Sequence, residues 1–143
     1  TAAPKFLDIQ GQATASTLQG VKAALQGGSQ LIYAKSAIAS EQRTASGDDV
    51  SSAGQTVNTT YGYPDANGAS ATTVSGWVEI SDADFTVVEN TGVAASNAVP
   101  GENTFAIVPA GGNTTPDYTQ TGLAGPSCHI LYTNSTASEL APT

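Results

Sequence analysis

The first forty residues carry the pattern that most restricts the fold, because their apolar side chains recur at the spacing of one long α-helix. Pro4 lies near the start, where proline is tolerated in the first turn of a helix. We therefore predict a helix over residues 3–41 and expect its apolar face to be covered by the rest of the chain. The residues on that face are Leu7, Leu18, Val21, Leu25 and Ile32.

The length of this helix predicts assembly. About 39 helical residues span roughly 58 Å at 1.5 Å per residue. A compact domain of this chain length has a radius of gyration near 14.5 Å and hence a diameter of about 37 Å. The helix is longer than its own domain can cover, so its free end needs another partner. The alternative is a break at Gly27–Gly28, since paired glycines favour helix ends.

A second stripe of small residues runs beside the apolar face. Ala13, Gly20, Gly27 and Ala34 recur every seven residues, and each glycine costs a helix about 1 kcal/mol relative to alanine. Close approach of another backbone would compensate for that cost. The assembly interface predicted from this stripe and the free end of the helix comprises Phe6, Ile9, Ala13 and Gly20. For Gly27 and Ala34, packing against the subunit's own loops is equally consistent with the pattern.

After Arg43 the helical pattern is replaced by short strands and turns. We therefore predict a single α+β domain over 1–143. Residues 1–42 would form the helix spine, and residues 43–143 would form a head that contains the sheet. Thr44–Gln55 is predicted to be a loop, Gly62–Ser70 a turn, and Thr73–Ser81 a short helix capped by Thr73. We expect Trp77 to join the core between helix and sheet. The strand candidates of the antiparallel sheet are Thr56–Tyr61, Phe85–Glu89, Thr104–Pro109 and Cys128–Thr133.

Charge is distributed unevenly along the chain, whose net charge is −8. All four basic residues lie within 1–43, which carries a net charge of +2. The segment 44–143 contains ten acidic residues and no Lys or Arg. Such a surface cannot neutralise phosphates, so we predict no nucleic-acid partner. The asymmetry would suit subunits that pack a basic element against acidic neighbours, although solvated charges without a partner explain it equally well.

The side chains that catalysis normally needs are scarce. His129 is the only histidine and Cys128 the only cysteine. As neighbours on a strand they would point to opposite faces, which disfavours a Cys–His nucleophilic pair. We expect neither an enzyme nor a cofactor. Weak cation binding at Asp82 and Asp84, or at Asp65 with Asn67, is less favoured than simple solvation of these side chains.

Three segments resemble type IV pilins of the mannose-sensitive haemagglutinin (MSHA) kind. The opening AAPKFLDIQGQATASTLQGVKAALQGGSQLIYAKSAIAS at residues 2–40 carries most of the likeness, and YGYP at Tyr61–Pro64 and CHILYT at Cys128–Thr133 add to it. The resemblance implies a helix packed on a four-stranded antiparallel sheet. It also implies a preceding apolar helix segment with a methylated N-terminus, so that this chain would be the soluble fragment that follows it.

The same resemblance implies a function and a location. The chain would be the structural subunit of an extracellular, cell-surface filament, a homopolymer that mediates attachment and biofilm formation. Before assembly it would be held in the inner membrane and handled by the pilus assembly machinery. The alternative is a minor pilin or pseudopilin that acts as a non-polymerising binding module at a tip. Many type IV pilins close their C-terminal region with a disulfide, whereas Cys128 has no partner in this chain; we expect it to be a buried thiol, with pairing between chains as the alternative.

Overall fold

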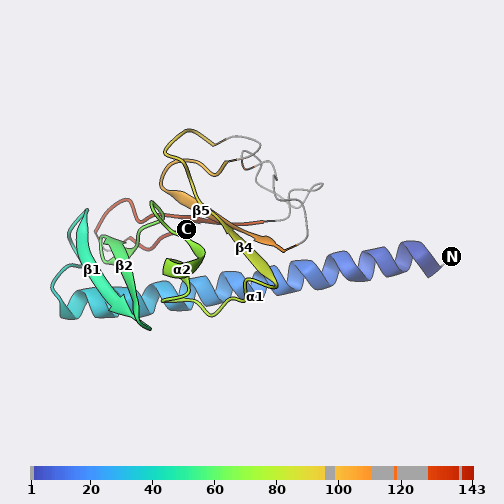
Figure 1. Ribbon diagram of the computed structural model, residues 1–143, viewed down its shortest axis with the longest axis horizontal. Helices are drawn as coiled ribbons and strands as arrows, with labels where there is room; N and C mark the ends of the chain where they lie inside the picture. The colour runs from blue at the N-terminus through green and yellow to red at the C-terminus, as the bar shows by residue number, and fades with distance from the viewer. Residues whose placement is uncertain (1, 96–98, 111–117, 119–128, 139) are drawn as a thin grey trace.

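The computed structural model describes residues 2–95, 99–110, 118, 129–138 and 140–143, except for the side chains of 2–14 and of residue 48. The molecule consists of one long helix and a head that lies along the C-terminal part of that helix (Figure 1). The α+β class and the antiparallel strand pairing predicted from the sequence are both present.

Helix α1 runs without interruption from Ala2 to Ile38. Its 37 residues span about 55 Å at 1.5 Å per residue. The helix continues through Gly27 and Gly28, so the break considered from the sequence does not occur. Lys35 anchors its last turn, because the ammonium group donates to the carbonyl oxygen of Ser51 at 3.3 Å and to the hydroxyl of Ser52 at 3.1 Å. The N-terminal part of α1 extends beyond the described part of the head (Figure 1).

The first sheet is a three-stranded meander made of β1 (Gly47–Ser52), β2 (Gln55–Thr60) and β3 (Tyr63–Pro64). Both of its turns have two central residues with positive φ: 48° and 77° at Ala53 and Gly54, then 51° and 84° at Tyr61 and Gly62. This is the geometry of type I′ hairpins, whose twist matches that of the strands they join. The predicted loop Thr44–Gln55 is therefore wrong, because it contains β1.

The second sheet has the strand order β4-β5-β6, with β4 at Phe85–Val88, β5 at Thr104–Pro109 and β6 at Ile130–Thr133. Both outer strands pair antiparallel to β5. The expected single four-stranded sheet is replaced by two three-stranded sheets. The physical reason lies at β3, which has only two residues and ends in Pro64, a residue with no N–H to continue a ladder.

Side chains bridge the two sheets where a backbone ladder is missing. The hydroxyl of Tyr132 donates to the carbonyl oxygen of Pro64 at 2.7 Å. Beside it, the N–H of Ala66 donates to the side-chain oxygen of Asn134 at 2.6 Å. Both bonds join the residues at the end of β3 to those of β6 and its continuation, so the head behaves as one packed unit.

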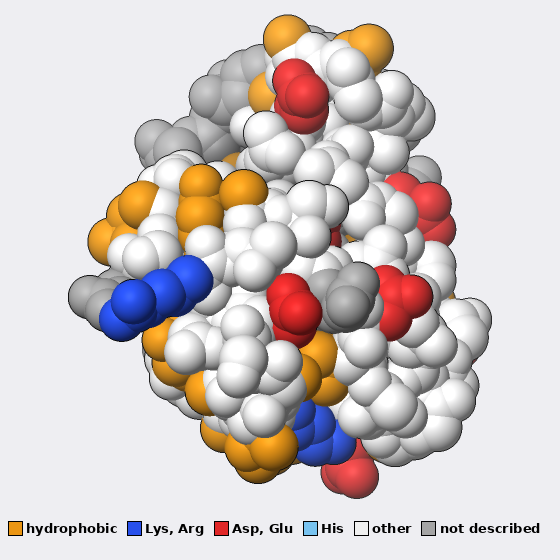
Figure 2. Space-filling model, turned by 90° about the vertical axis from the view of Figure 1, so that its left-hand side faces the viewer, with side chains coloured by type: hydrophobic (Ala, Val, Ile, Leu, Met, Phe, Trp, Pro, Cys, Tyr) orange, Lys and Arg blue, Asp and Glu red, His pale blue; other side chains and the backbone are white. Residues whose placement is uncertain are grey.

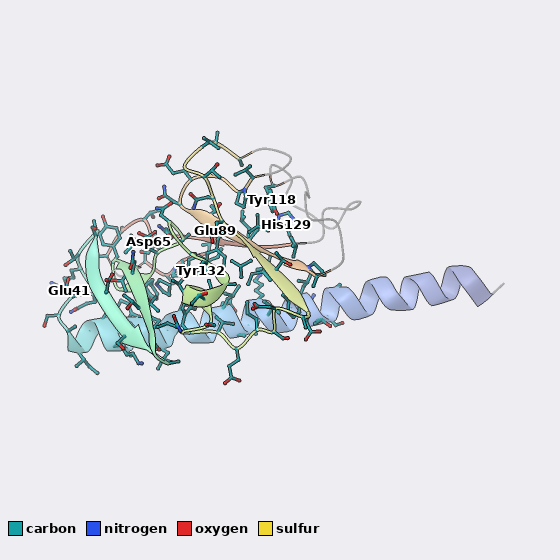
Figure 3. The ribbon with its side chains drawn as sticks, in the orientation of Figure 1. Glu41, Asp65, Glu89, Tyr118, His129 and Tyr132 are labelled. Carbon is teal, nitrogen blue, oxygen red and sulfur yellow. The ribbon has the colours of Figure 1, made fainter. Side chains whose placement is uncertain are left out.

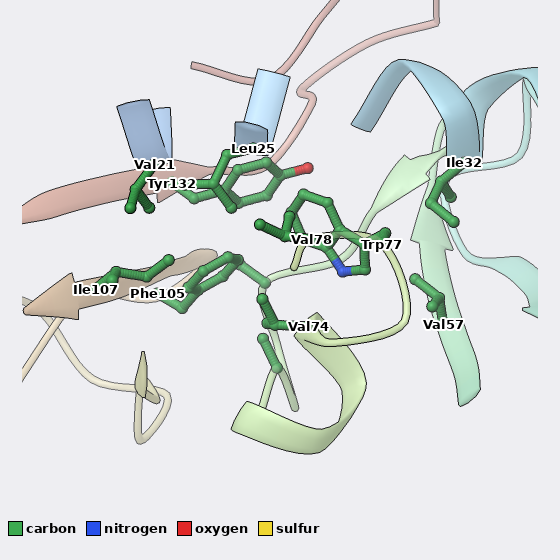
Figure 4. Packing of buried hydrophobic residues seen from close by; sticks show 12 residues of the cluster. Val21, Leu25, Ile32, Val57, Val74, Trp77, Val78, Phe105, Ile107 and Tyr132 are labelled. Atoms are coloured by element: carbon green, nitrogen blue, oxygen red, sulfur yellow. The ribbon is translucent and has the colours of Figure 1, made fainter. Parts of the chain in front are cut away.

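The short helix α2 covers only Ala71–Val74, and Ser70 is its N-cap. Thr73, predicted to be the cap, is instead the third helical residue of a capping box, in which its hydroxyl accepts from the N–H of Ser70 at 2.8 Å. This helix ends just before Trp77, which enters the core. Figure 4 shows Trp77 among residues of α1 and of both sheets. The buried cluster comprises Val21, Leu25, Ile32, Val57, Ala66, Ala69, Val74, Trp77, Val78, Phe105, Ile107 and Tyr132.

The C-terminal segment returns to the edge of β6. The N–H of Thr133 donates to the carbonyl oxygen of Thr143 at 2.7 Å, and the N–H of Thr143 donates back to Thr133 at 3.1 Å. Between them, the buried hydroxyl of Ser135 lies 2.6 Å from the carbonyl oxygen of Leu140. Backbone pairing thus closes this segment. Cys128, whose burial was predicted, lies outside the described residues.

Candidate functional site

The side of α1 turned away from the sheets is lined by small and apolar residues. Leu31 and Ile38 are the large ones, and 51% and 87% of their surfaces are exposed. A β-carbon added at Gly20 or Gly27 would meet nothing within 4 Å. We call this surface the exposed helix face; its described members are Gly20, Ala24, Gly27, Leu31, Ala34 and Ile38, all of them exposed.

The spacing along this face alternates between three and four residues, as in the contact positions of a coiled coil. From residue 20 to residue 38 the face extends about 27 Å along the helix axis. Glycine and alanine allow two helix axes to approach closely, and leucine and isoleucine supply apolar area to bury. The face therefore has the shape and chemistry to receive a second helix lengthwise.

The structure describes one residue of the predicted assembly interface and all five residues of the predicted core. The side chains of Phe6, Ile9 and Ala13 lie outside the described residues, while Gly20 is exposed. Because α1 is continuous, the seven-residue spacing places position 13 in line with Gly20. The residues predicted to form the helix–sheet core are all buried, namely Leu18, Val21, Leu25, Ile32 and Trp77.

The position of the head answers a question that the sequence left open for Gly27 and Ala34. Gly27 and Ala34 are exposed, so they do not pack against the subunit's own loops. Leu31 and Ile38 were not identified beforehand as members of this face. The signal was present in their spacing, since each follows a member of the small-residue stripe by four residues.

Uncharged side chains predominate on the end of the molecule where α1 ends. Figure 2 shows hydrophobic groups there among many polar ones, with charged side chains scattered singly or in pairs. A surface of this kind carries little electrostatic repulsion between copies. Among the helices that the structure describes, none is both long enough and apolar enough to cross a membrane.

The second feature that the sequence singled out, Asp65 with Asn67, belongs to a polar network that joins the two sheets. The carboxylate of Asp65 accepts from the N–H of Asn67 at 2.8 Å and from the side-chain amide of Asn134 at 2.7 Å. The side-chain oxygen of Asn67 accepts from the N–H of Asn103 and from the amide of Asn90, both at 3.2 Å. Oδ1 of Asp65 and Oδ1 of Asn67 thus each accept from two N–H donors, and the network links the two sheets.

Asn134 is the central residue of this network, and we expect Asn134→Ala to lower the free energy of unfolding by about 2 kcal/mol, because the buried N–H of Ala66 loses its acceptor. Urea denaturation measures the change. Asn58→Ala is the matched control, since Asn58 is an exposed asparagine on β2. Equal losses in the two variants would show that the network contributes nothing.

Three aromatic or titratable side chains of the head, Tyr118, His129 and Tyr132, contact neighbouring residues of the head. The rings of Tyr118 and His129 meet edge to face at 5.0 Å (Figure 3). His129 precedes β6 and is partly exposed, so the prediction that it lies on this strand is wrong. Burial, with the nearby charge of Asp65 and then Tyr63 as smaller contributors, raises the pKa of Tyr132 well above its ordinary value. Tyr132 therefore keeps its proton and acts as a hydrogen-bond donor.

The remaining acidic candidates, Asp82 and Asp84, are exposed in the loop before β4. Within the described ranges, no group of three or more His, Cys, Asp or Glu side chains lies close enough together to hold a metal ion. The exposed helix face is thus the described surface that best fits an interaction.

Comparisons with protein-family models, with curated proteins and with solved structures find no match to this chain.

Proposed function

We propose that this protein is a structural subunit of a type IV pilus filament, in which α1 packs lengthwise against the α1 helices of neighbouring copies. The observation that carries the proposal is the exposed helix face, which offers open space at Gly20 and Gly27 and uncovered apolar surface at Leu31 and Ile38. Exposed apolar area of this kind indicates a site of interaction with another molecule. A second copy of the chain supplies a matching helix face of the same composition.

The length and direction of α1 support polymerisation over a closed dimer. The helix extends beyond the described part of the head (Figure 1), so its two ends lie in different surroundings. Contacts between the N-terminal part of one helix and the exposed helix face of another are heterologous, and such contacts continue indefinitely when the rotation does not close. The resemblance of residues 2–40 to the MSHA kind of type IV pilin gives this filament its proposed place on the cell surface. Attachment and biofilm formation follow from that place.

The composition of surface filaments tests this function. We expect this chain to be the main protein in filaments sheared from cells that express it, and we expect deletion of its gene to remove those filaments, as seen by electron microscopy. Mass spectrometry of the sheared fraction identifies the subunit. Filaments that persist after deletion, or that contain this chain only in trace amounts, would contradict a structural role and leave a tip-binding role.

A further inference from the structure

A groove runs between α1 and β6 on the side of the molecule away from the exposed helix face. Its volume is about 250 Å³, and it is lined on the helix side by Lys22, Leu25, Gln26 and Ser29. Ile130, Leu131 and Tyr132 line the strand side, and Thr143 closes one end. We call it the β6 groove.

The strand side of the β6 groove is an outer edge of the second sheet, where the described residues leave some backbone groups without a partner. In the order β4-β5-β6, β6 is an outer strand. The N–H and C=O of Thr133 point away from β5, since they bond to Thr143. By the alternation of a strand, the N–H and C=O of Leu131 point the same way, and no described residue bonds them. Thr143 shows that this edge accepts extended backbone.

The other outer strand of the same sheet is β4, whose outer edge likewise has backbone groups without a partner among the described residues. The C=O of Asp84 accepts from Ala110, next to β5, at 2.9 Å. Alternation therefore turns the N–H and C=O of Val87 away from β5, where the described residues offer them no partner. The two edges face opposite ways across the sheet, so a contact between them joins different surfaces of two copies.

Charge favours this pairing of edges over its alternatives. Lys22 in the β6 groove is exposed, and no acidic side chain of the described chain pairs with it. The β4 edge follows the exposed Asp82 and Asp84 and precedes the exposed Glu89. A contact of β6 with β6 would instead bring two Lys22 side chains together, and a contact of β4 with β4 would bring acids together.

We propose that β4 of a second copy adds to the edge of β6 in this groove, so that the second sheet continues from subunit to subunit. The inference rests on the proposed function, because it adds a head-to-head contact to the packing of α1. Both β4 and β6 run antiparallel to β5 and therefore run in the same direction. In a filament whose copies all point the same way, β4 of one copy and β6 of the next would therefore pair in parallel. The contact is short, and it sets the register of the heads while the helices supply most of the buried area.

A proline at the open edge tests the contact directly. Leu131→Pro removes the outward N–H and leaves the bonds to β5 intact, because proline is tolerated on the free side of an edge strand. We expect about a tenfold loss in the yield of sheared filaments, since the lost main-chain bond recurs at every contact. Leu131→Ala is the matched control: it keeps the N–H and should give normal filaments. Filaments at wild-type yield from Leu131→Pro would overturn the proposal.

Two further measurements keep the test decisive if Leu131→Pro fails to fold. Val87→Pro blocks the partner edge and should give the same loss. Lys22→Glu should also reduce filaments, and adding Asp82→Lys with Asp84→Lys should restore them. Normal filaments from Val87→Pro and Lys22→Glu would leave the filament function in place and remove this contact.

Cross-linking separates a failure of this inference from a failure of the filament function. Carbodiimide joins a lysine to a carboxylate in direct contact, and mixing isotope-labelled with unlabelled protein identifies links between copies. At high protein concentration, we expect the purified chain to give a Lys22 link to Asp82 or Asp84 of another copy, even if no surface filament contains it. Links from Lys22 only to residues outside the β4 edge, or no link at all, would overturn the inference.

Discussion

Replacing Gly28 with alanine should lower the free energy of unfolding by about 2–3 kcal/mol, although alanine is the better helix former by about 1 kcal/mol. The reason is the backbone of Trp77. A β-carbon at position 28 would fall inside the van der Waals distance of the Trp77 carbonyl oxygen and would lie 3.0 Å from its carbonyl carbon and from its ring. Trp77 is buried against Phe105 and Tyr132, so its backbone cannot move aside without disturbing the core.

The neighbouring glycine is the control, and its expected change has the opposite sign. A β-carbon at Gly27 would meet nothing within 4 Å, so Gly27→Ala should raise the free energy of unfolding by up to about 1 kcal/mol. Urea denaturation of both variants, with the slope m compared to exclude changes in the unfolded state, measures the difference. Changes of the same sign in the two variants would show that Trp77 does not explain why α1 carries paired glycines.

Gly27 and Gly28 also show why the sequence predicts that α1 forms but not which distant residues it contacts. The helix follows from local spacing, because the apolar positions of residues 18–32 repeat with the period of an α-helix and indicate which face is covered. The need for glycine at position 28 arises from Trp77, far along the chain. Nothing near Gly27–Gly28 distinguishes a helix break from a close contact.

Strands rich in apolar residues were easier to predict from the sequence than strands poor in them. β5 is buried along most of its length, and the predicted bounds Thr104–Pro109 are those observed. β1 was missed because Val50 is the only large apolar residue in GDDVSS; its place depends on the turn at Ala53–Gly54 and on pairing with β2. The division into two sheets follows from the shortness of β3 and from Pro64 at its end. The link between the sheets depends on the side chains of Tyr132 and Asn134, and no local pattern reports such bonds.

The exposed helix face could be predicted only in part for a similar reason. The seven-residue spacing of small residues predicts that Gly20 belongs to an interface along one side of the helix. Leu31 and Ile38 are large and apolar, and apolar side chains favour the core when only composition is known. Their exposure depends on how far the head extends around α1, which is set by Trp77 and by the contacts of α1 with β1, β3 and β6.

The exposed helix face leads to the largest functional effect that we expect. Gly20→Leu should abolish surface filaments or reduce them to traces, because a bulky side chain separates helices that approach closely at a small residue. The subunit itself should remain folded. Position 20 has open space around it, and leucine is a better helix former than glycine, so the free energy of unfolding should rise by up to about 1 kcal/mol.

Electron microscopy of sheared filaments, an immunoblot for subunit in the membrane fraction, and urea denaturation of the purified chain together measure these effects. Gln19→Leu is the control, since it adds the same side chain at an exposed position about 100° around the helix from the exposed helix face. That variant should assemble normally. Normal filaments from Gly20→Leu would remove the face from the proposed filament, because a leucine cannot fit where two backbones meet. Equal loss in both variants would instead indicate a general effect of added apolar surface, and failure of the Gly20→Leu chain to fold would place position 20 in the core.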